Sequence, residues 1–218
     1  MYKTIVFDLD GTLLDTLDDL TAAVNFAWAE FHFPLRTREE VRGFVGNGIV
    51  KLMERAVGQE NIEKVDFENV LSVFREYYKV HCADKTKPYE NVLLLLQTLK
   101  EKGVKTAVLS NKADFAVKML AKEYFGDLLL EAVGENEAAG IRKKPAPDSL
   151  FTVMEKLDAK KEETVYVGDS EVDIQTAQNA GVACLSVTWG FKDEAFLVEN
   201  GAEAFAREPY EILRFCGE

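Results

Sequence analysis

The apolar positions of this chain follow two alternating patterns, short continuous runs and longer segments with helical spacing. The runs with almost no polar interruption are residues 4–9, 105–110, 164–169 and 183–188. Runs of this kind are typical of strands buried on both faces, as in a parallel sheet that helices cover. We expect weaker strands near Leu128 and Ala204.

The segments between these runs carry the start and stop signals of helices. Gly103 and Gly181 each end such a segment, and glycine is favoured just after a helix. Pro147 and Asp148 open another, as proline and aspartate do in a first helical turn. Strands and helices therefore alternate, which predicts an α/β fold with a doubly wound, Rossmann-like parallel sheet.

One long region departs from this alternation. In residues 17–84, apolar residues recur at helical spacing and no convincing strand pattern is present. We therefore expect residues 16–85 to form an all-helical domain that is inserted after the first strand. Residues 1–15 and 86–218 would then form the α/β core, joined to the insertion by two hinge segments.

Composition narrows the classes of partner. The 218 residues are 47% hydrophobic, which is enough for a substantial core. With 26 basic and 38 acidic residues the net charge is −12, so nucleic acids and anionic membranes are unfavourable partners. The 3 cysteines are scattered without metal-ligand spacing, as in a reduced intracellular protein. The sequence has no leader pattern and no membrane-spanning run, so we expect a cytoplasmic protein.

Two aspartates, Asp8 and Asp10, lie where the first apolar run ends. Side chains two positions apart in a strand point the same way, and parallel sheets bind ligands at the carboxyl ends of their strands. Neighbouring carboxylates repel each other unless a cation lies between them or one is protonated. Gly11 and Thr12 allow a tight turn that exposes amide donors beside them. Alone, this pattern also describes a loop cap or a solvated turn.

Two further groups of polar residues lie at other predicted strand ends, and a third lies on a loop just before a predicted helix. They are residues 110–112 (Ser-Asn-Lys), the pair Asp169 and Asp173, and the basic residues 142–144. Each group alone is also explained by a helix cap or a solvated loop. Together they supply the carboxylates, hydroxyl and lysine that phosphoryl transfer with a hard divalent cation requires. The sequence therefore predicts an enzyme that uses Mg²⁺.

These residues resemble the four motifs of the haloacid dehalogenase-like hydrolase superfamily. The match comprises "DLDGTLLDT" from Asp8, Ser110, Lys144 in "KPAP" and "GDSEVD" from Gly168, in the same order, and it extends over essentially the whole chain. The resemblance implies that Asp8 attacks phosphorus and becomes an aspartyl-phosphate, while Asp10 acts first as general acid and then as general base. The dehalogenase branch lacks the second aspartate, so dehalogenation is not expected.

The same resemblance implies roles for the remaining groups. Thr12 would help to orient Asp10, and the phosphate-binding groups would be Thr12, Ser110, Asn111 and Lys144. The ligands of Mg²⁺ would be Asp8, the main-chain carbonyl of Asp10, and Asp169. Asp173 would support the metal through its water shell or orient neighbouring groups.

The helical insertion resembles the cap domain of one subfamily, which suits a small phosphate ester. Within it, Gly46, Asn47 and Gly48 are similar to the substrate loop of phosphoglycolate phosphatases, although a plain helix–helix turn also explains them. One departure from that group is Asp148, which follows "KPAP" where phosphoglycolate phosphatases commonly carry a further proline. "KPAPD" also occurs in relatives of β-phosphoglucomutase, but those usually lack an acidic residue at the position of Asp173, so Asp173 favours hydrolysis.

We therefore expect a Mg²⁺-dependent phosphatase of a small phosphate monoester, with 2-phosphoglycolate as the best single candidate. A β-phosphoglucomutase-like phosphomutase, a pyrophosphatase and a nucleotidase of the same superfamily remain open, as do sugar phosphates. Complete motifs disfavour a binding module without turnover. The expected partner is a small phosphorylated metabolite, without nucleic acid or membrane, and the chain is expected to be a monomer or a homodimer.

Overall fold

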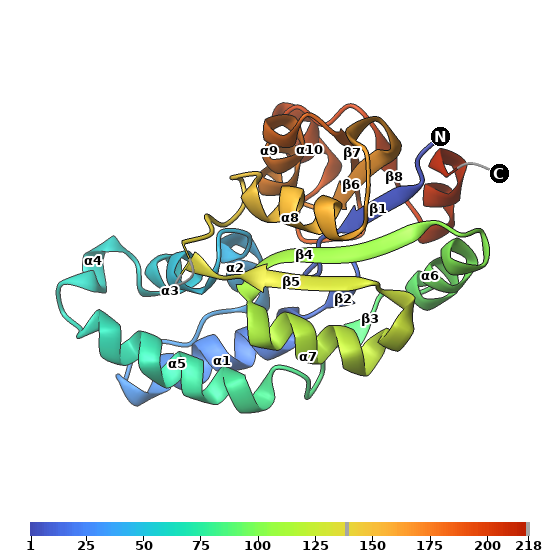
Figure 1. Cartoon of the computed structure of the whole chain (residues 1–218). Coiled ribbons are helices and arrows are strands. Elements are labelled where there is room, and N and C mark those ends of the chain that lie inside the picture. Colours follow the sequence, from blue (N-terminus) through green and yellow to red (C-terminus); the bar gives the residue numbers. More distant parts are fainter. Residues whose placement is uncertain (138–139, 217–218) are drawn as a thin grey trace. The chain divides into compact units, whose positions relative to one another are not determined.

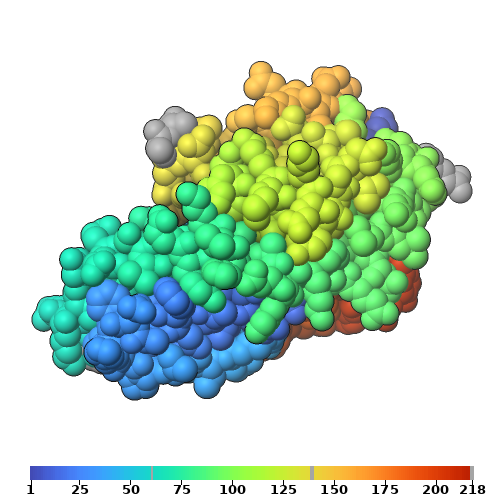
Figure 2. Space-filling view, turned by 90° about the horizontal axis from the view of Figure 1, so that it is seen from below, coloured from blue at the N-terminus to red at the C-terminus, as the bar shows by residue number. Residues whose placement is uncertain are grey.

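The computed structural model describes residues 1–137 and 140–216, with the side chain of Glu60 excepted. The chain divides into two compact units. One unit comprises Met1–Leu14 and Pro88–Glu218, and the other is the continuous segment Asp15–Lys87. In Figures 1 and 2 the second unit is coloured from blue to teal.

A six-stranded sheet forms the centre of the first unit, with the strand order β5-β4-β1-β6-β7-β8 and parallel pairing throughout. The strands are β1 (Thr4–Phe7), β4 (Lys105–Ala113), β5 (Glu131–Glu135), β6 (Thr164–Gly168), β7 (Ala183–Val187) and β8 (Phe205–Ala206). All residues of β1 and β6 are buried, as expected for strands covered on both faces. The sheet confirms the predicted α/β class.

Helices cover both faces of this sheet. They are α6 (Val92–Glu101), α7 (Asp114–Tyr124), α8 (Asp148–Lys156), α9 (Glu171–Ala180) and α10 (Glu194–Glu199), with the short 3-10 segments η1 (Gly126–Leu128), η3 (Lys161–Glu163) and η4 (Pro209–Phe215). Figure 1 shows α6 and α7 on one side of the sheet and α8 and α9 on the other. Under α8 and α9, Val6, Leu109 and Tyr166 of three adjacent strands pack in one core cluster.

The second unit is helical. Its helices are α1 (Leu17–Glu30), α2 (Arg38–Phe44), α3 (Ile49–Val57), α4 (Gln59–Ile62) and α5 (Phe67–His81). The buried residues of α1 include Leu17, Leu20, Val24 and Trp28, at the helical spacing seen in the sequence. The Asp19 carboxylate accepts hydrogen bonds from the Lys85 and Thr86 backbone N–H groups, and it thereby ties α1 to the segment that follows α5.

The short strands β2 (Leu14–Asp15) and β3 (Lys87–Pro88) pair in a two-stranded sheet where the chain passes from one unit to the other and back.

Across the described ranges, we find no helix whose length and apolar character would let it cross a membrane.

The predicted end of the second strand at residue 110 is wrong. Strand β4 continues to Ala113, because an irregularity between Leu109 and Ala113 shifts its register against β5 and lets the pairing resume. Ser110 therefore lies inside the strand, and the residue before α7 is Ala113. This position excludes the alternative that Ser110 caps the following helix.

Candidate active site

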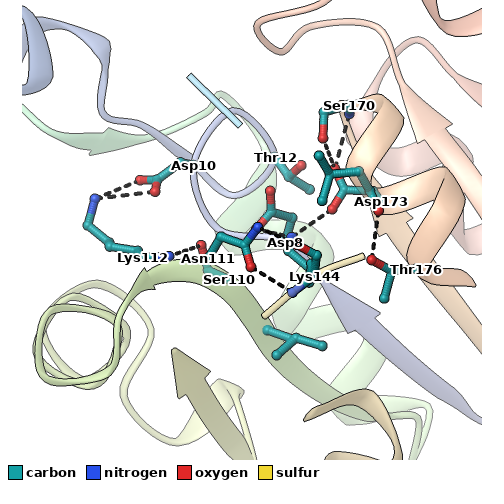
Figure 3. A network of polar contacts seen from close by, with 12 residues as sticks. Asp8, Asp10, Thr12, Ser110, Asn111, Lys112, Lys144, Ser170, Asp173 and Thr176 are labelled. Atoms are coloured by element: carbon teal, nitrogen blue, oxygen red, sulfur yellow. Dashed lines mark hydrogen bonds and ion pairs between the residues drawn. The ribbon is translucent and has the colours of Figure 1, made fainter. Parts of the chain in front are cut away.

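The site lies at the carboxyl edge of three neighbouring strands. Strand β1 pairs with β4 and with β6, and Phe7 at its end is level with Val108 and Val167. The residues that follow these positions therefore meet at one edge of the sheet, as expected for parallel strands. Asp8 comes directly after β1, and Asp169 directly after β6. Figure 3 shows the polar network that these elements bring together.

Lys144 connects several of the predicted site residues. Its Nζ lies 2.9 Å from Asp8 Oδ1 and 2.7 Å from Asp173 Oδ1, and it donates a hydrogen bond of 3.0 Å to the Tyr166 hydroxyl. The Tyr166 hydroxyl in turn donates to the Leu109 carbonyl at 2.9 Å. Tyr166 carried no functional signal in the sequence, because a tyrosine in an apolar run is indistinguishable from an ordinary core residue.

The Asn111 side chain holds the Lys144 segment in place. Its Oδ1 accepts from the Lys144 backbone N–H at 2.9 Å, and its Nδ2 donates to the Lys144 carbonyl at 3.0 Å. The two neighbouring bases turn to other partners: Arg142 pairs with Asp148 and Lys143 with Glu137, all with partly exposed side chains. Of the three consecutive bases, only Lys144 is brought to the site.

Asp173 is held by its own helix terminus. It lies in the first turn of α9, where its Oδ2 accepts from the Ser170 backbone N–H at 3.0 Å and from the Ser170 hydroxyl at 2.7 Å. The opposite oxygen faces Lys144. Gly168 makes room for this arrangement, since a Cβ at that position would lie 2.3 Å from Asp173 Cγ.

Asp169 is enclosed by backbone. Its Oδ2 accepts from the Phe191 N–H at 2.7 Å, and its Oδ1 accepts from the Thr12 hydroxyl at 3.3 Å. A Cβ added to Gly11 or to Gly190 would come within 2.3 or 2.4 Å of Asp169. The role of Gly190 escaped sequence reasoning, because the glycine approaches Asp169 only through the folded chain. The Thr12 side chain therefore contacts Asp169, a partner that the sequence did not indicate.

Asp10 pairs with a second buried lysine. Lys112 Nζ lies 2.9 Å from Asp10 Oδ1 and 3.3 Å from Asp10 Oδ2, and the two side chains are 3% and 14% exposed. Figure 3 shows the Asp10 carboxylate pointing toward Lys112 and away from Asp8. Sequence reasoning noted Lys112 at the strand end but gave it no role. A lysine that ends an apolar run is the only local signal for it.

The carboxylates of the site are short of positive charge. Burial raises the pKa of Asp8 to about 7; Lys144 opposes this effect, while the charges of Asp173 and Asp10 add to it. Burial, together with the charges of Asp173 and Asp8, holds the pKa of Asp169 well above its usual range. Burial lowers the pKa of Lys144, but the charges of Asp173 and Asp8 more than offset this and keep it well above the ordinary value.

These carboxylates fit a hard divalent cation. Asp8, Asp169 and Asp173 each offer an oxygen within 4.8 Å of the others, and all three residues are buried. Oxygen donors of this kind suit Mg²⁺, which would supply the missing positive charge. Both Asp173 oxygens accept hydrogen bonds, and so do both Asp169 oxygens, so hydrogen bonding does not rank one of these two carboxylates above the other as a metal ligand. The Asp10 side chain lies outside this cluster, and only its main-chain carbonyl was expected to bind the metal.

The three tentative substrate-loop residues belong to the helical unit. Gly46, Asn47 and Gly48 lie between α2 and α3, and both glycines have positive φ angles, of 127° and 84°. Arg55 braces this loop by donating to Asn47 Oδ1 at 2.6 Å and to the Phe44 carbonyl at 2.8 Å. A helix–helix turn and a substrate loop both have this form, so the substrate role stays a prediction.

The sequence of this chain matches a known protein family over the region that contains the site. The family model described as haloacid dehalogenase-like hydrolase matches residues 5–187, which contain all four motifs. The chain belongs to the haloacid dehalogenase-like hydrolase family. This membership confirms the resemblance that the motifs indicated.

Relatives within the haloacid dehalogenase-like hydrolases carry a more specific name. Phosphoglycolate phosphatase of Pseudomonas syringae pv. syringae is 36% identical over 98% of this chain and 79% of that protein. Phosphoglycolate phosphatase of Haemophilus influenzae is 34% identical over 93% of this chain and 92% of that protein. A crystal structure from Lactobacillus delbrueckii subsp. bulgaricus, assigned as a phosphoglycolate phosphatase, is 37% identical with a TM-score of 0.91 and covers 100% of this chain and 99% of its own.

Proposed function

We propose that this protein is a Mg²⁺-dependent phosphatase that hydrolyses a small phosphate monoester through an aspartyl-phosphate on Asp8. The observation that carries the proposal is the surroundings of Asp8. This buried carboxylate has Lys144 at 2.9 Å and shares a possible metal site with Asp169 and Asp173. A nucleophile, a cation beside it and a metal-ligand set are the parts that phosphoryl transfer to a carboxylate requires.

In the first half of the reaction, an Asp8 oxygen attacks phosphorus. The new O–P bond forms as the bond from phosphorus to the ester oxygen breaks, and Asp10 gives its proton to the departing alkoxide. Lys144 offsets the negative charge of the nucleophile and of the phosphoryl group. The Ser110 hydroxyl and the Asn111 main-chain amide are proposed to bind phosphoryl oxygens.

In the second half, water attacks the phosphorus of the aspartyl-phosphate. Asp10, now a carboxylate, takes a proton from this water, and inorganic phosphate leaves as Asp8 recovers its oxygen. Mg²⁺, held by Asp8, Asp169 and the Asp10 carbonyl and supported by Asp173, would stabilise the charge on the transferring group.

For the substrate, we propose 2-phosphoglycolate. The support is that the relatives covering nearly the whole of this chain are named phosphoglycolate phosphatases. The cap loop with Gly46, Asn47 and Gly48 is proposed to contribute to this choice. A small ester also suits a haloacid dehalogenase-like hydrolase with a helical insertion of this size.

The test measures inorganic phosphate released by purified protein from 2-phosphoglycolate, with MgCl₂ and with EDTA. A panel containing pyrophosphate, nucleoside monophosphates and glucose phosphates is run in parallel. We expect release that requires Mg²⁺ and a kcat/KM that is highest for 2-phosphoglycolate. Isomerised sugar phosphate without release of phosphate would identify a phosphomutase and contradict the proposal.

The intermediate is tested separately. Rapid quenching followed by borohydride reduction should convert Asp8 to homoserine, which peptide mass spectrometry detects. Asp8→Asn should abolish both phosphate release and the reduced residue. Asp158→Asn makes the same chemical change at an exposed position and should leave both unchanged. Turnover by Asp8→Asn at the wild-type rate would show that the covalent scheme is wrong.

A further inference from the structure

Lys112 is a buried cation for which the proposed reaction has no task. It lies in β4, its side chain is 3% exposed, and its Nζ contacts both oxygens of Asp10. The other buried lysine, Lys144, faces Asp8 and Asp173 instead. A buried charge is costly unless a counter-charge accompanies it, so the Asp10 carboxylate contributes to keeping Lys112 in this position.

Asp10 cannot keep this pairing throughout the proposed reaction. Its carboxyl group has to serve the ester oxygen of a phosphoryl group bound to Asp8, yet both of its oxygens lie against Lys112. In Figure 3 the Asp10 carboxylate points away from Asp8. Asp10 must therefore release Lys112, at least in part, before the ester bond breaks. Lys112 then loses the counter-charge that Asp10 supplied.

We propose that Lys112 is a specificity-determining residue, whose ammonium group exchanges Asp10 for a second anionic group on the substrate. The inference rests on the proposed function and names the substrate class, phosphate esters of small 2-hydroxy acids. A substrate carboxylate replaces the Asp10 carboxylate with a group of the same charge and shape. An ester without this charge leaves Asp10 attached to Lys112 and reacts slowly.

The position of the second anionic group follows from the position of Asp10. The Asp10 carboxyl group passes from Lys112 to the ester oxygen by rotation of its own side chain, so the place that it leaves is one side-chain rotation away from that oxygen. The inference assigns this place to a carboxylate that one carbon atom separates from the ester oxygen. The exchange couples the release of Asp10 to the arrival of the correct substrate, and selectivity arises from charge pairing as well as from shape.

The test compares 2-phosphoglycolate with ethyl phosphate, which has the same skeleton without the carboxylate. The kcat/KM for each ester is measured for the wild-type protein, for Lys112→Met and for the control Lys122→Met, an exposed lysine of α7. The wild-type protein should prefer 2-phosphoglycolate. In Lys112→Met this preference should fall at least about 30-fold, the loss typical of truncating one partner of a buried charge pair. Lys122→Met should keep it.

Two results would overturn the inference alone. Equal losses for both esters would show that Lys112 only positions Asp10, and an unchanged preference would show that it has no part in selection. Absence of phosphate release from either ester by the wild-type protein would instead refute the proposed function, and the inference with it.

A second measurement uses the wild-type protein and Lys112→Arg, so that the inference does not depend on the methionine variant folding. Inhibition constants are determined for 3-phosphonopropionate and for propylphosphonate, two unreactive analogues that differ by the carboxylate. The carboxylated analogue should bind at least about 10-fold more tightly to both proteins, because both retain the cation. Equal binding of the two analogues to the wild-type protein would overturn the inference.

Discussion

Replacing Asp8 with asparagine should stabilise the metal-free protein at neutral pH and above, although it removes the proposed nucleophile. Burial raises the pKa of Asp8 from 3.8 to about 7, with Lys144 opposing the effect and Asp173 and Asp10 adding to it. A shift of this size corresponds to about 4 kcal/mol between the charged and neutral forms. Asparagine has nearly the same shape without the charge, so it escapes this cost.

The sign of the pH dependence follows from proton binding. Between the two pKa values of Asp8, 3.8 for the unfolded chain and about 7 for the folded one, the folded protein retains a proton that the unfolded chain has lost. The free energy of unfolding of the wild-type protein therefore falls, relative to the variant, as the pH rises through this window. The cost is absent below the window and complete above it. Bound Mg²⁺ should reduce it by favouring the charged carboxylate.

Thermal unfolding followed by circular dichroism in EDTA measures this effect. From pH 4 to pH 8, the melting temperature of Asp8→Asn should rise relative to wild type by about 10 °C, as about 4 kcal/mol implies for a chain of this length. Adding MgCl₂ should narrow the gap. Asp158→Asn, at an exposed position, should follow the wild type at every pH. Parallel profiles for Asp8→Asn and wild type, or a less stable variant at pH 8, would refute the reasoning.

Three other substitutions test separate parts of the site. Gly190→Ala places a methyl group 2.4 Å from Asp169 Cβ. It should lower kcat/KM about 100-fold or more and raise the Mg²⁺ concentration needed for half-maximal rate. The control is Gly43→Ala, because nothing lies within 4 Å of the Cβ that it adds. Tyr166→Phe removes two buried hydrogen bonds and should cost about 1–3 kcal/mol in urea unfolding, and an unchanged midpoint would contradict this contribution. Asp10→Asn should slow breakdown of the phosphoenzyme about 100-fold or more in quench-flow, whereas loss of phosphate binding alone would count against its acid–base role.

Several features of the site could be read from local patterns. Asp8 and Asp169 each follow a continuous apolar run, and the strand–helix alternation implied that such ends share one edge of a parallel sheet. The motif around Lys144 separated it from Arg142 and Lys143 by resemblance alone. Charge could not do so, because three adjacent bases differ only in what they meet in the folded chain.

Other features depend on residues that are distant in sequence. The extension of β4 beyond residue 110 comes from its pairing with β5, which no window around Ser110 contains. Gly190 leaves room for the Asp169 side chain, and the Tyr166 hydroxyl accepts a hydrogen bond from Lys144. The residues of each pair are about twenty positions apart in the sequence. Such contacts leave no periodic signal, since each involves a single residue on either side.

The sequence by itself determined the α/β alternation, the helical insertion and the placement of acidic residues at strand ends. These are consequences of short-range periodicity, which each segment carries within itself. Only the tertiary structure decided which charges pair: Lys144 with Asp8 and Asp173, and Lys112 with Asp10. It also decided the raised pKa of Asp8, because the desolvation and charges that shift a pKa come from whichever groups folding brings near, whatever their distance along the chain.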